Sequence, residues 1–590
     1  MLSAIREYGA KLGGEPGFKA RDIRWCIDLD GQGRLLGLLP LGDERAGVTL
    51  DRCPDMHAMN AGGKSHFLIE SAQTIALHFK TGEDDKKIES AKVRHEFFSH
   101  LIAKAADKVA SLTGIRTFLA DEHNMDALRG KMREQRVKPT DWVTWHVNGA
   151  DPRVDELVQS WWREWRRADL AIDEGMSDAS LVEPMICLLS GESMVPLATH
   201  PKITGLTGVG GLAMGDVLVG CDKAAFTSFG LDQSANAAMG SVVAQQYVDG
   251  LNDLIKKHSR RLANSLVVYW FKERVPEEED PLAFLYGLES EDQQTASALL
   301  QARNLLDAIR SGQRADLADN HYYAMTLSGA AGRVMVRDWM EGPFAGLVEN
   351  VVSWFDDLSV VDIFSGAIAR DPKFFEVCLA LIRNDRNKSI SENLKKLPAV
   401  NASTLWRAAA YNQHIPSPLF AQALDCFRSA LLADEPFSHA RIGLIKAYFA
   451  RNPEGEDKSM KPYLNPEHPN PAYHCGRLLA ILAGLQRAAL GDVGSGVVQR
   501  FYPAASQTPG LTLGRLIANS RNHLGKLDAG LSWWYENEIA SVLGQMGDAP
   551  PRVLDLQGQG LFALGYYQQL ANLRAGKKTD TNDIQSGAIA

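Results

Sequence analysis

The sequence predicts an α+β fold: an N-terminal mixed α/β region with short strands and glycine-rich turns, followed by a C-terminal all-α helical bundle. Short alternating apolar runs, which indicate strands, fade from about residue 400, and apolar residues then recur with helical spacing. The length of 590 residues also exceeds what one hydrophobic core supports, since single cores stop growing at roughly 250–300 residues. We therefore expect residues 1–398 to form the mixed region and residues 399–590 the bundle.

The mixed region opens with a short amphipathic helix at residues 3–13. Residues 23–29 then alternate apolar and polar side chains, as in a strand. Asp30-Gly31 supplies a turn, and residues 35–39 form the second strand. This pattern is typical of a β-hairpin.

A helix at residues 89–112 and a strand at 143–147 come next; the expected apolar face of the helix is Val93, Phe97, Leu101 and Ile102. Residues 155–168 form a further helix, rich in Trp and Arg. Aromatic side chains interleaved with basic ones can stack on bases and bind phosphates. The spacing of Leu157, Trp161 and Trp165 favours a buried seam, with Arg163, Arg166 and Arg167 outside.

The loop at residues 54–66 places Gly62-Gly63 beside Lys64. Its flexible backbone, one amide and one cation suit a segment that reads a DNA groove. A solvated loop is the alternative that the local sequence favours slightly.

The stretch from Cys187 to Tyr247 consists of strand-like pieces separated by glycines. Residues 186–189 and 217–219 predict buried strands, and the glycines of 205–215 permit positive φ or close backbone approach. Such a segment suits a flat or anionic ligand, but a chain of tight turns between strands explains it more simply.

Basic residues gather after this stretch. A helix at 240–257 ends in Lys256-Lys257-His258-Ser259-Arg260-Arg261, where cations suit the helix C-terminus and also suit phosphate contacts. Strands are expected at 265–271 and 321–327, and Arg333 and Arg337 follow a glycine turn.

Helical periodicity fills the C-terminal region. Asn470-Pro471 suits a helix start, and Gly491 suits its end. Amphipathic helices with short connections predict a bundle. Their apolar positions are Phe420, Leu424, Phe427 and Leu431; Ile442, Ile445 and Phe449; Leu478, Leu482 and Leu485; Leu513, Leu516, Ile517, Leu524 and Leu527; Ile539, Val542 and Met546; and Phe562, Tyr566, Leu570 and Leu573.

Charge argues against a protein that coats nucleic acid indiscriminately, because 63 Lys and Arg oppose 72 Asp and Glu for a net charge of −9. Residues 471–530 are different, because their six basic and two acidic residues give this segment a net charge of +4. This contrast favours a local nucleic-acid-facing surface. The seven scattered cysteines form no metal or disulfide pattern, and we expect reduced thiols in the cytoplasm.

Catalytic constellations are weak throughout. GLTGVGG lacks the Lys-Ser/Thr of a P-loop, and Cys187, His200 and Cys221 match no recurring zinc spacing. We therefore expect neither a catalytic site nor a metal or other cofactor.

Several segments together carry a family resemblance. They are MLSAIREYGAKL, IRWCIDLDGQGRLLGLLPL, the ordered set SGE, HPKITG and AFTSFG, TLSGAAGRVMVRDW and QGLFALGYYQQL. In this order they resemble the large subunit of type I-C CRISPR surveillance complexes, the Csd-type large-subunit family of Cascade, over nearly the whole chain. Cys221-Asp222 and residues 235–238 depart from the usual pattern.

The resemblance implies a non-catalytic subunit that recognises the protospacer-adjacent motif in duplex DNA, promotes unwinding, stabilises the R-loop and helps recruit a nuclease-helicase. The implied partners are guide RNA, target DNA, and the backbone and 5′-handle-capping subunits. In this family a small subunit can be made from an internal start, and Met460 would begin residues 460–590 as such a segment. A nucleotide- or nucleic-acid-processing enzyme using residues 205–215 and a structural helical scaffold remain alternatives.

Two sets of residues are candidates for DNA contact. Amides and lysines beside glycine turns can approach base edges in a groove, and the motif-reading candidates are Asn60, Gly62, Lys64, Lys202 and Asn236. The phosphate-contacting candidates are Lys256, Lys257, Arg260, Arg261, Arg333, Arg337, Arg477, Arg487, Arg500, Arg515 and Arg521.

Overall fold

The structure is a computed structural model with an α+β fold. It describes residues 1–42, 47–56, 63–173, 184–226, 229–286, 297–385, 387–451, 460–491, 493, 496–547 and 549–586. The chain divides into two compact units. The first unit contains residues 1–205, 212–256 and 331–334, and the second contains residues 206–211, 257–330 and 335–590.

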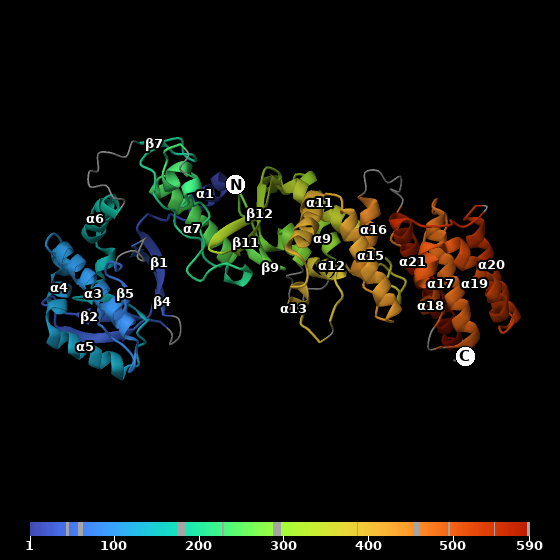
Figure 1. The fold of residues 1–590 in the computed structure, drawn as a ribbon, viewed down its shortest axis with the longest axis horizontal. Coiled ribbons are helices and arrows are strands. Elements are labelled where there is room, and N and C mark those ends of the chain that lie inside the picture. Colours follow the sequence, from blue (N-terminus) through green and yellow to red (C-terminus); the bar gives the residue numbers. More distant parts are fainter. Residues whose placement is uncertain are drawn as a thin grey trace. The chain divides into compact units, whose positions relative to one another are not determined.

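A four-stranded sheet lies at the centre of the first unit (Figure 1). In order across the sheet its strands are β3 (Leu35–Pro40), β2 (Trp25–Leu29), β6 (Trp142–Val147) and β5 (Glu70–Ser71). Strand β2 is antiparallel to β3 and parallel to β6. The Asp30 carboxylate accepts the Arg34 N–H at 2.8 Å and closes the turn between β2 and β3. The predicted hairpin and the predicted strand at 143–147 are therefore confirmed.

The other elements of the first unit surround this sheet or follow it in the chain. Strands β1 (Phe18–Ile23) and β4 (Val48–Pro54) form an antiparallel pair. The helices are α1 (Leu2–Lys11), α2 (Ala72–Ile75), α3 (Asp85–Ala106), α4 (Thr113–Ala120), α5 (Glu122–Glu134), α6 (Glu156–Asp173) and α7 (Ser241–Lys257). Buried Trp145 of β6 and Phe118 of α4 meet edge to face, with ring centroids 5.7 Å apart.

Two expected apolar faces are partly wrong. In α3, Val93 is 44% exposed and Phe98 is buried, so the face is rotated from the one expected. In α6, Trp162 is fully buried while Leu157 is 67% exposed. The seam itself is confirmed, because Trp162 and Trp165 stack with centroids 5.5 Å apart and Trp161 is also buried.

The strands expected in the central stretch are reduced to short pieces. Strand β7 (Met185–Ile186) pairs with β8 (Ser193–Met194), and Ile186 is 64% exposed rather than buried. Val217 makes only an isolated bridge with Arg333. The glycine content explains this outcome, since turns interrupt the chain before a ladder can extend.

A second four-stranded sheet begins the second unit. In order its strands are β12 (Arg333–Pro343), β11 (His321–Ala330), β10 (Ser265–Phe271) and β9 (Ser259–Leu262). Val267 and Tyr269 of β10 and Tyr322 and Ala324 of β11 point into the core. Strands expected at 265–271 and 321–327 are confirmed.

Helices fill the described chain from Phe344 onward (Figure 1). The helices of the second unit are α8 (Pro281–Tyr286), α9 (Ala298–Arg310), α10 (Ala315–Ala318), α11 (Phe344–Leu358), α12 (Phe374–Ala380), α13 (Ile390–Leu394), α14 (Ala399–Tyr411), α15 (Ser417–Leu432), α16 (His439–Ala450), α17 (Pro471–Leu490), α18 (Val497–Gln507), α19 (Pro509–Leu524), α20 (Ala529–Gly544) and α21 (Leu556–Ser586). The Asn470 side chain accepts the Ala472 N–H at 2.9 Å, so the expected cap of α17 is confirmed. Helix α18 was not among the expected helices, and Pro503 lies inside it.

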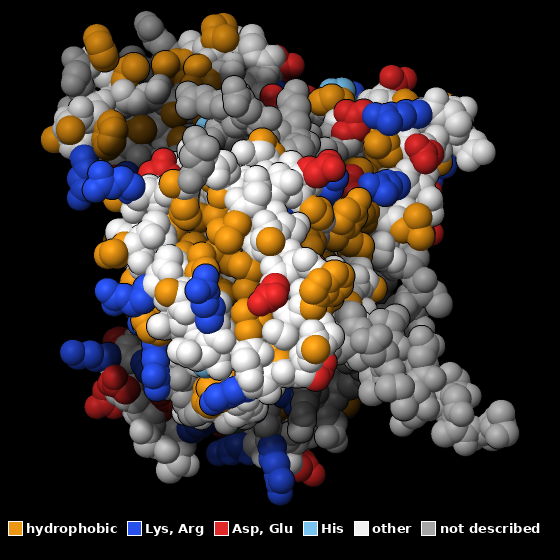
Figure 2. Space-filling model, turned by 90° about the vertical axis from the view of Figure 1, so that its right-hand side faces the viewer, with side chains coloured by type: hydrophobic (Ala, Val, Ile, Leu, Met, Phe, Trp, Pro, Cys, Tyr) orange, Lys and Arg blue, Asp and Glu red, His pale blue; other side chains and the backbone are white. Residues whose placement is uncertain are grey.

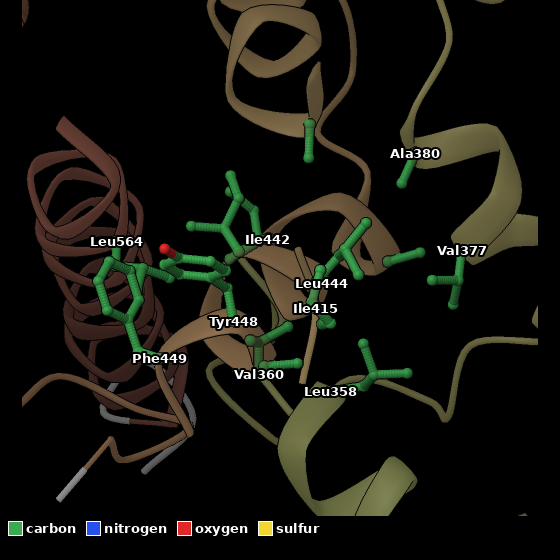
Figure 3. Close-up of a cluster of buried hydrophobic side chains, with 14 of the residues drawn as sticks. Leu358, Val360, Val377, Ala380, Ile415, Ile442, Leu444, Tyr448, Phe449 and Leu564 are labelled. Atoms are coloured by element: carbon green, nitrogen blue, oxygen red, sulfur yellow. The ribbon is translucent and has the colours of Figure 1, made fainter. Parts of the chain in front are cut away.

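Helix α16 is buried along nearly its whole length (Figure 3). Two cations on it satisfy carbonyls at the ends of other helices. The Arg441 guanidinium donates to the Ala380 carbonyl at 2.9 Å, and Lys446 Nζ donates to the Asp356 and Asp357 carbonyls at 3.0 and 2.9 Å. These last carbonyls have no partner within α12 and α11, so α16 fixes both helix ends.

Two further properties bear on function. All seven cysteines are free thiols, and six of them are buried. Among the helices of the described chain, none combines the length and the apolar composition that a membrane span requires.

Candidate nucleic-acid interface

Of the motif-reading candidates in the loop at 54–66, only Lys64 lies in the described part, because Asn60 and Gly62 fall outside it. Lys64 is partly buried. The preceding Gly63 has a φ of +73°, and a Cβ there would lie 2.5 Å from Val93 Cγ1, so this position requires glycine. Lys64 therefore follows a backbone turn that only glycine forms without strain.

A polar cluster anchors the segments on both sides of this loop. Arg21 pairs with Asp55, and one of its nitrogens lies 3.0 Å from His66 Nε2. Its guanidinium lies 4.4 Å from the Trp142 ring centroid. Burial lowers the pKa of His66, and the nearby Arg21 lowers it further. The other ring nitrogen, Nδ1, lies 2.9 Å from the Met56 backbone nitrogen, so both nitrogens of the ring have polar neighbours. The geometry holds residues 55–56 and 66 in place beside Lys64.

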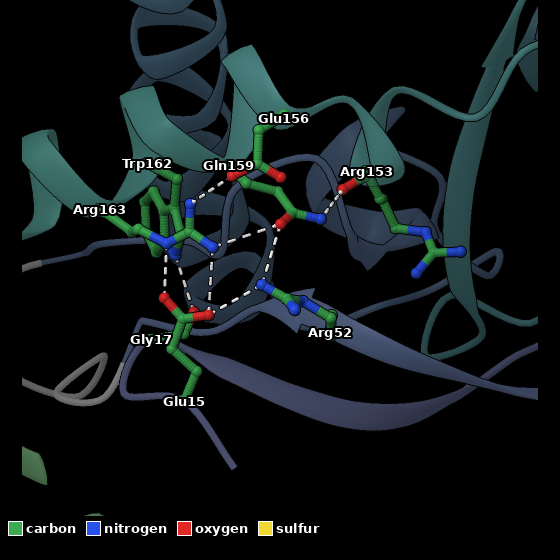
Figure 4. A network of polar contacts seen from close by, with 8 residues as sticks. All are labelled: Glu15, Gly17, Arg52, Arg153, Glu156, Gln159, Trp162 and Arg163. Carbon is green, nitrogen blue, oxygen red and sulfur yellow. Dashed lines mark hydrogen bonds and ion pairs between the residues drawn. The ribbon is translucent and has the colours of Figure 1, made fainter. Parts of the chain in front are cut away.

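Arg163 of α6 makes its contacts within the first unit (Figure 4), and the Arg167 side chain lies outside the described part. Arg163 makes a bidentate contact with the Glu15 carboxylate, because its Nε donates to Oε1 at 2.5 Å and its Nη2 donates to Oε2 at 3.2 Å. Arg52 donates to the same carboxylate at 2.8 Å. Hydrogen bonding from Arg163 is the main cause that lowers the pKa of Glu15. Arg166 is 9% exposed, so the expectation that it lies outside is wrong. Helix α6 thus builds an internal network rather than a base-stacking surface.

Lys202 and Asn236 lie on neighbouring segments of the first unit, joined by a hydrogen bond from the Ser234 N–H to the Ala198 carbonyl at 3.1 Å. Lys202 is exposed. The Asn236 amide donates to the Leu231 and Gln233 carbonyls, both at 3.0 Å. Its nitrogen holds a turn together, which leaves the amide oxygen as the group suited to a ligand.

The glycine-rich turn contains a carboxylate of its own. Asp216 is fully buried, and both of its oxygens lie 3.2 Å from the Leu212 N–H. Within the second unit, Gly329 of β11 requires glycine, because a Cβ there would lie 2.2 Å from Gly211 Cα. The buried Asp216 carboxylate disfavours an anionic ligand beside it, because like charges repel.

The basic cluster after α7 faces solvent. Lys256, Lys257, Arg260 and Arg261 are all exposed. The Arg261 Nε donates to the Ala263 carbonyl at 3.3 Å. This leaves much of the guanidinium accessible for a phosphate.

Arg333 and Arg337 follow the glycine turn as expected and lie on β12, and both are exposed. Arg333 pairs with Asp222 at 3.0 Å, and the Arg337 Nε donates to Ser328 Oγ at 3.0 Å. The Arg333 pair is solvent-exposed and therefore weak.

Comparison with protein-family models decides the family. The model described as CRISPR-associated protein (Cas_Csd1) matches residues 5–574. The chain belongs to this family. The resemblance to the Csd-type large-subunit family of Cascade is confirmed, and a CRISPR-associated role within Cascade follows. A search of curated proteins found no match.

For this Csd1-family chain, the prediction that Arg477 contacts nucleic-acid phosphates is wrong. Arg477 of α17 is 4% exposed, and its Nε donates to Gln569 Oε1 of α21 at 2.9 Å. Another of its nitrogens lies 3.1 Å from His474 Nδ1. Burial lowers the pKa of Arg477. Arg477 therefore joins two core helices and does not face a nucleic acid.

The other C-terminal candidates remain at the surface. Arg487, Arg500, Arg515 and Arg521 are exposed on α17, α18 and α19. Figure 2 looks onto the end of the molecule that carries α20 and shows apolar side chains across its middle, with Lys and Arg side chains mainly toward its margins. The exposed apolar residues of α19 and α20 are Leu511, Leu531, Trp533 and Trp534.

The described residues of this Csd1-family chain hold no group of three or more His, Cys, Asp or Glu placed to bind a metal ion. Cys187 is buried, and His200 Nδ1 lies 2.7 Å from the Tyr247 hydroxyl. Burial lowers the pKa of His200 to about 4, so this ring is neutral at pH 7. Basic residues near 390 were missed by the sequence analysis, although their density in residues 383–396 is a readable signal.

Proposed function

We propose that this chain is the large subunit of a type I-C Cascade complex that recognises the protospacer-adjacent motif in double-stranded DNA. It would promote unwinding, stabilise the R-loop and help recruit the separate nuclease-helicase. The family match over residues 5–574 is the observation that carries this proposal. In RNA-guided complexes base pairing reads the target, so protein contacts are needed only for the flanking motif and the strand backbones.

Two regions of the chain would have different roles. Residues 1–398 would read the motif through Lys64, Lys202 and Asn236, with Asn60 and Gly62 in the same loop as Lys64. Lysines and amides can hydrogen-bond to base edges in a groove, which suits this role. Exposed cations on α7, β9 and β12 would contact phosphates.

Residues 399–590 would guide the displaced strand. Arg487, Arg500, Arg515 and Arg521 support this role, since all four are exposed cations. Guide RNA and the backbone and handle-capping subunits would be the other partners, in the cytoplasm. Residues 460–590 would also be made as a small subunit from Met460.

We propose that the chain is not itself an enzyme. The strongest enzymatic candidate, the glycine-rich turn at 205–215, gains no support from its interior. The buried Asp216 directly follows this turn, and repulsion between like charges disfavours an anionic ligand beside its carboxylate.

The test compares guide-loaded complexes assembled with and without this chain. Binding of duplex targets with and without the flanking motif is measured at two salt concentrations. Omission of the chain should abolish the preference for motif-bearing duplexes and weaken binding. Unchanged binding and unchanged preference would overturn the proposal, and a nucleotide-binding screen of the purified chain would then be warranted.

A further inference from the structure

A small basic lobe stands apart from the residues discussed above. It comprises residues 383–396 of the second unit, of which residue 386 lies outside the described part, and it contains α13. In Figure 1 the lobe extends below α12. Its described cations, Arg383, Lys388, Lys395 and Lys396, are all exposed, and its acidic residues are Asp385 and Glu392.

The lobe is held rigid from within by Asn393, which is 4% exposed. Its amide nitrogen donates to the carbonyls of Asp385, Lys388 and Ser389 at 3.0, 3.3 and 3.3 Å. Its oxygen accepts the Asp385 N–H at 2.9 Å. The described residues of the loop before α13, 385 and 387–389, are therefore held in place before any partner arrives, which reduces the entropy cost of binding.

The two carboxylates of the lobe are occupied by its own backbone. Glu392 accepts the Ser389 N–H at 2.9 Å in a capping box, and this bond is the main cause that lowers the pKa of Glu392. Asp385 accepts the Asn387 N–H at 3.0 Å and lies 3.8 Å from Lys388 Nζ. The Lys388 side chain is 49% exposed, so water screens this pair and leaves the cation available.

A turn with a held backbone and several exposed cations suits a regular array of negative charges. Phosphodiester backbones have this charge pattern, and lysines bind phosphates as point charges without reading sequence. Ile390, 55% exposed, is the exposed apolar side chain at the start of α13, so the lobe offers little apolar surface to a protein partner.

We propose that the lobe at residues 383–396 contacts the phosphodiester backbone of a nucleic acid through Lys388 and Lys395. This inference rests on the proposed function, because that function brings both DNA and guide RNA to the complex. The contact is independent of sequence and therefore adds affinity without changing the preference for a flanking motif.

The test uses the Lys388→Gln/Lys395→Gln variant in the complete guide-loaded complex. Both lysines are exposed, and Lys396, whose Nζ donates to Asn393 at 2.9 Å, is kept so that the lobe stays folded. The matched control is Arg303→Gln/Arg310→Gln on α9. It removes the same charge from exposed arginines that pair with Asp356 and Glu349 at 2.5 and 2.6 Å.

Two arms separate the two sources of phosphate. The first measures target-duplex binding by the complex over a range of salt, and the second measures binding of this chain to the guide-loaded remainder of the complex over the same range. In one arm the slope of log affinity against log salt should fall by roughly 0.9 for each duplex phosphate that the variant no longer neutralises, or by roughly 0.7 for each phosphate of single-stranded RNA. The control should leave both slopes unchanged.

Unchanged slopes in both arms, with normal wild-type binding of motif-bearing duplexes, would overturn the lobe proposal and leave the proposed function standing. A salt-independent loss of assembly in the lysine variant would also overturn it and would indicate a protein partner instead. If duplex binding never depends on the chain, the proposed function fails, and the guide-RNA arm alone then decides the lobe.

Discussion

Gly476 of α17 and Gly565 of α21 lie at the same helix crossing, and each accommodates a backbone carbonyl of the opposite helix. A Cβ on Gly476 would lie 1.9 Å from the Phe562 oxygen, and one on Gly565 would lie 2.0 Å from the Tyr473 oxygen. The two glycines are therefore what allows these helices to approach so closely. The crossing lies in the core of the C-terminal helices and fixes the position of α17, which carries Arg487.

Adding one methyl group at this crossing should separate the helices. Gly476→Ala is expected to destabilise the second unit by about 3 kcal/mol, since overpacking a tight core costs about 1–3 kcal/mol and here the obstacle is backbone. Urea unfolding measures the loss. The matched control is Gly514→Ala in α19, where the added Cβ meets nothing within 4 Å and should stabilise by about 0.5–1 kcal/mol. Equal stability of the two variants would contradict the packing explanation.

His474, beside this crossing, should make stability depend on pH. Its Nε2 donates to the His468 carbonyl at 2.6 Å, so Nδ1 is the nitrogen that faces Arg477. Burial lowers the pKa of His474 to about 4, below the ordinary 6.5. Between pH 4 and 6.5 the unfolded chain therefore binds more protons, and stability rises with pH.

The expected change for His474 is a loss of up to about 3 kcal/mol on going from pH 6.5 to pH 4. Urea unfolding at pH 6.5 and pH 4.5 measures it in the wild type and in His474→Gln, which cannot titrate there. The variant should lose less stability over this interval than the wild type. An identical loss in both proteins would show that other groups account for the acid dependence.

The Arg407–Asp338 ion pair joins α14 to β12. Arg407 Nε lies 2.5 Å from Asp338 Oδ2, and the Asp338 side chain is only 4% exposed. Arg407→Met leaves this carboxylate buried without its cation, which is expected to cost about 3 kcal/mol. Adding Asp338→Asn should restore part of the loss, because a neutral amide replaces the charge. Thermal unfolding of both variants measures this, and a double variant no more stable than Arg407→Met would argue against the charge explanation.

Sequence patterns predicted those elements whose signals are local. The β2–β3 turn needs only Asp30 and Gly31, and the start of α17 needs only Asn470 and Pro471. The stripe on α15 likewise follows from spacing within one helix. Each of these is decided by a few neighbouring residues, so no tertiary information was required.

Burial of charged and aromatic residues depended on distant partners and was not predictable in the same way. Arg477 was expected at the surface, but its partner Gln569 lies 92 residues later. In α6, Trp162 is buried because its indole donates to the Gly17 carbonyl, 145 residues earlier, and stacks on Phe67. Helical spacing alone does not show which face meets such partners.

Arg477 and Arg521 were both predicted from the sequence to contact phosphates, but they differ in burial. Arg521 of α19 is exposed, and Arg477 of α17 lies in the core. In the assembled complex Arg521→Ala should weaken binding of all duplexes alike and lower the salt slope by about 1. Arg477→Gln should leave the slope unchanged and instead lower the stability of the chain. A reduced slope for Arg477→Gln, or an unchanged one for Arg521→Ala, would contradict the assigned positions.

Lys64 should behave differently from a phosphate contact, because its proposed role is to read bases. It follows Gly63, whose positive φ sets the direction of the chain, and the Arg21–Asp55–His66 cluster anchors the flanking residues. Lys64→Ala is expected to reduce the preference for motif-bearing over motif-lacking duplexes by about 1 kcal/mol, roughly fivefold. Lys86→Ala, at an exposed lysine of α3 in the first unit, serves as the control and should leave the preference intact. Competition binding with the two duplexes measures both variants, and an equal loss of affinity for both duplexes in Lys64→Ala would assign this lysine to the phosphate backbone instead.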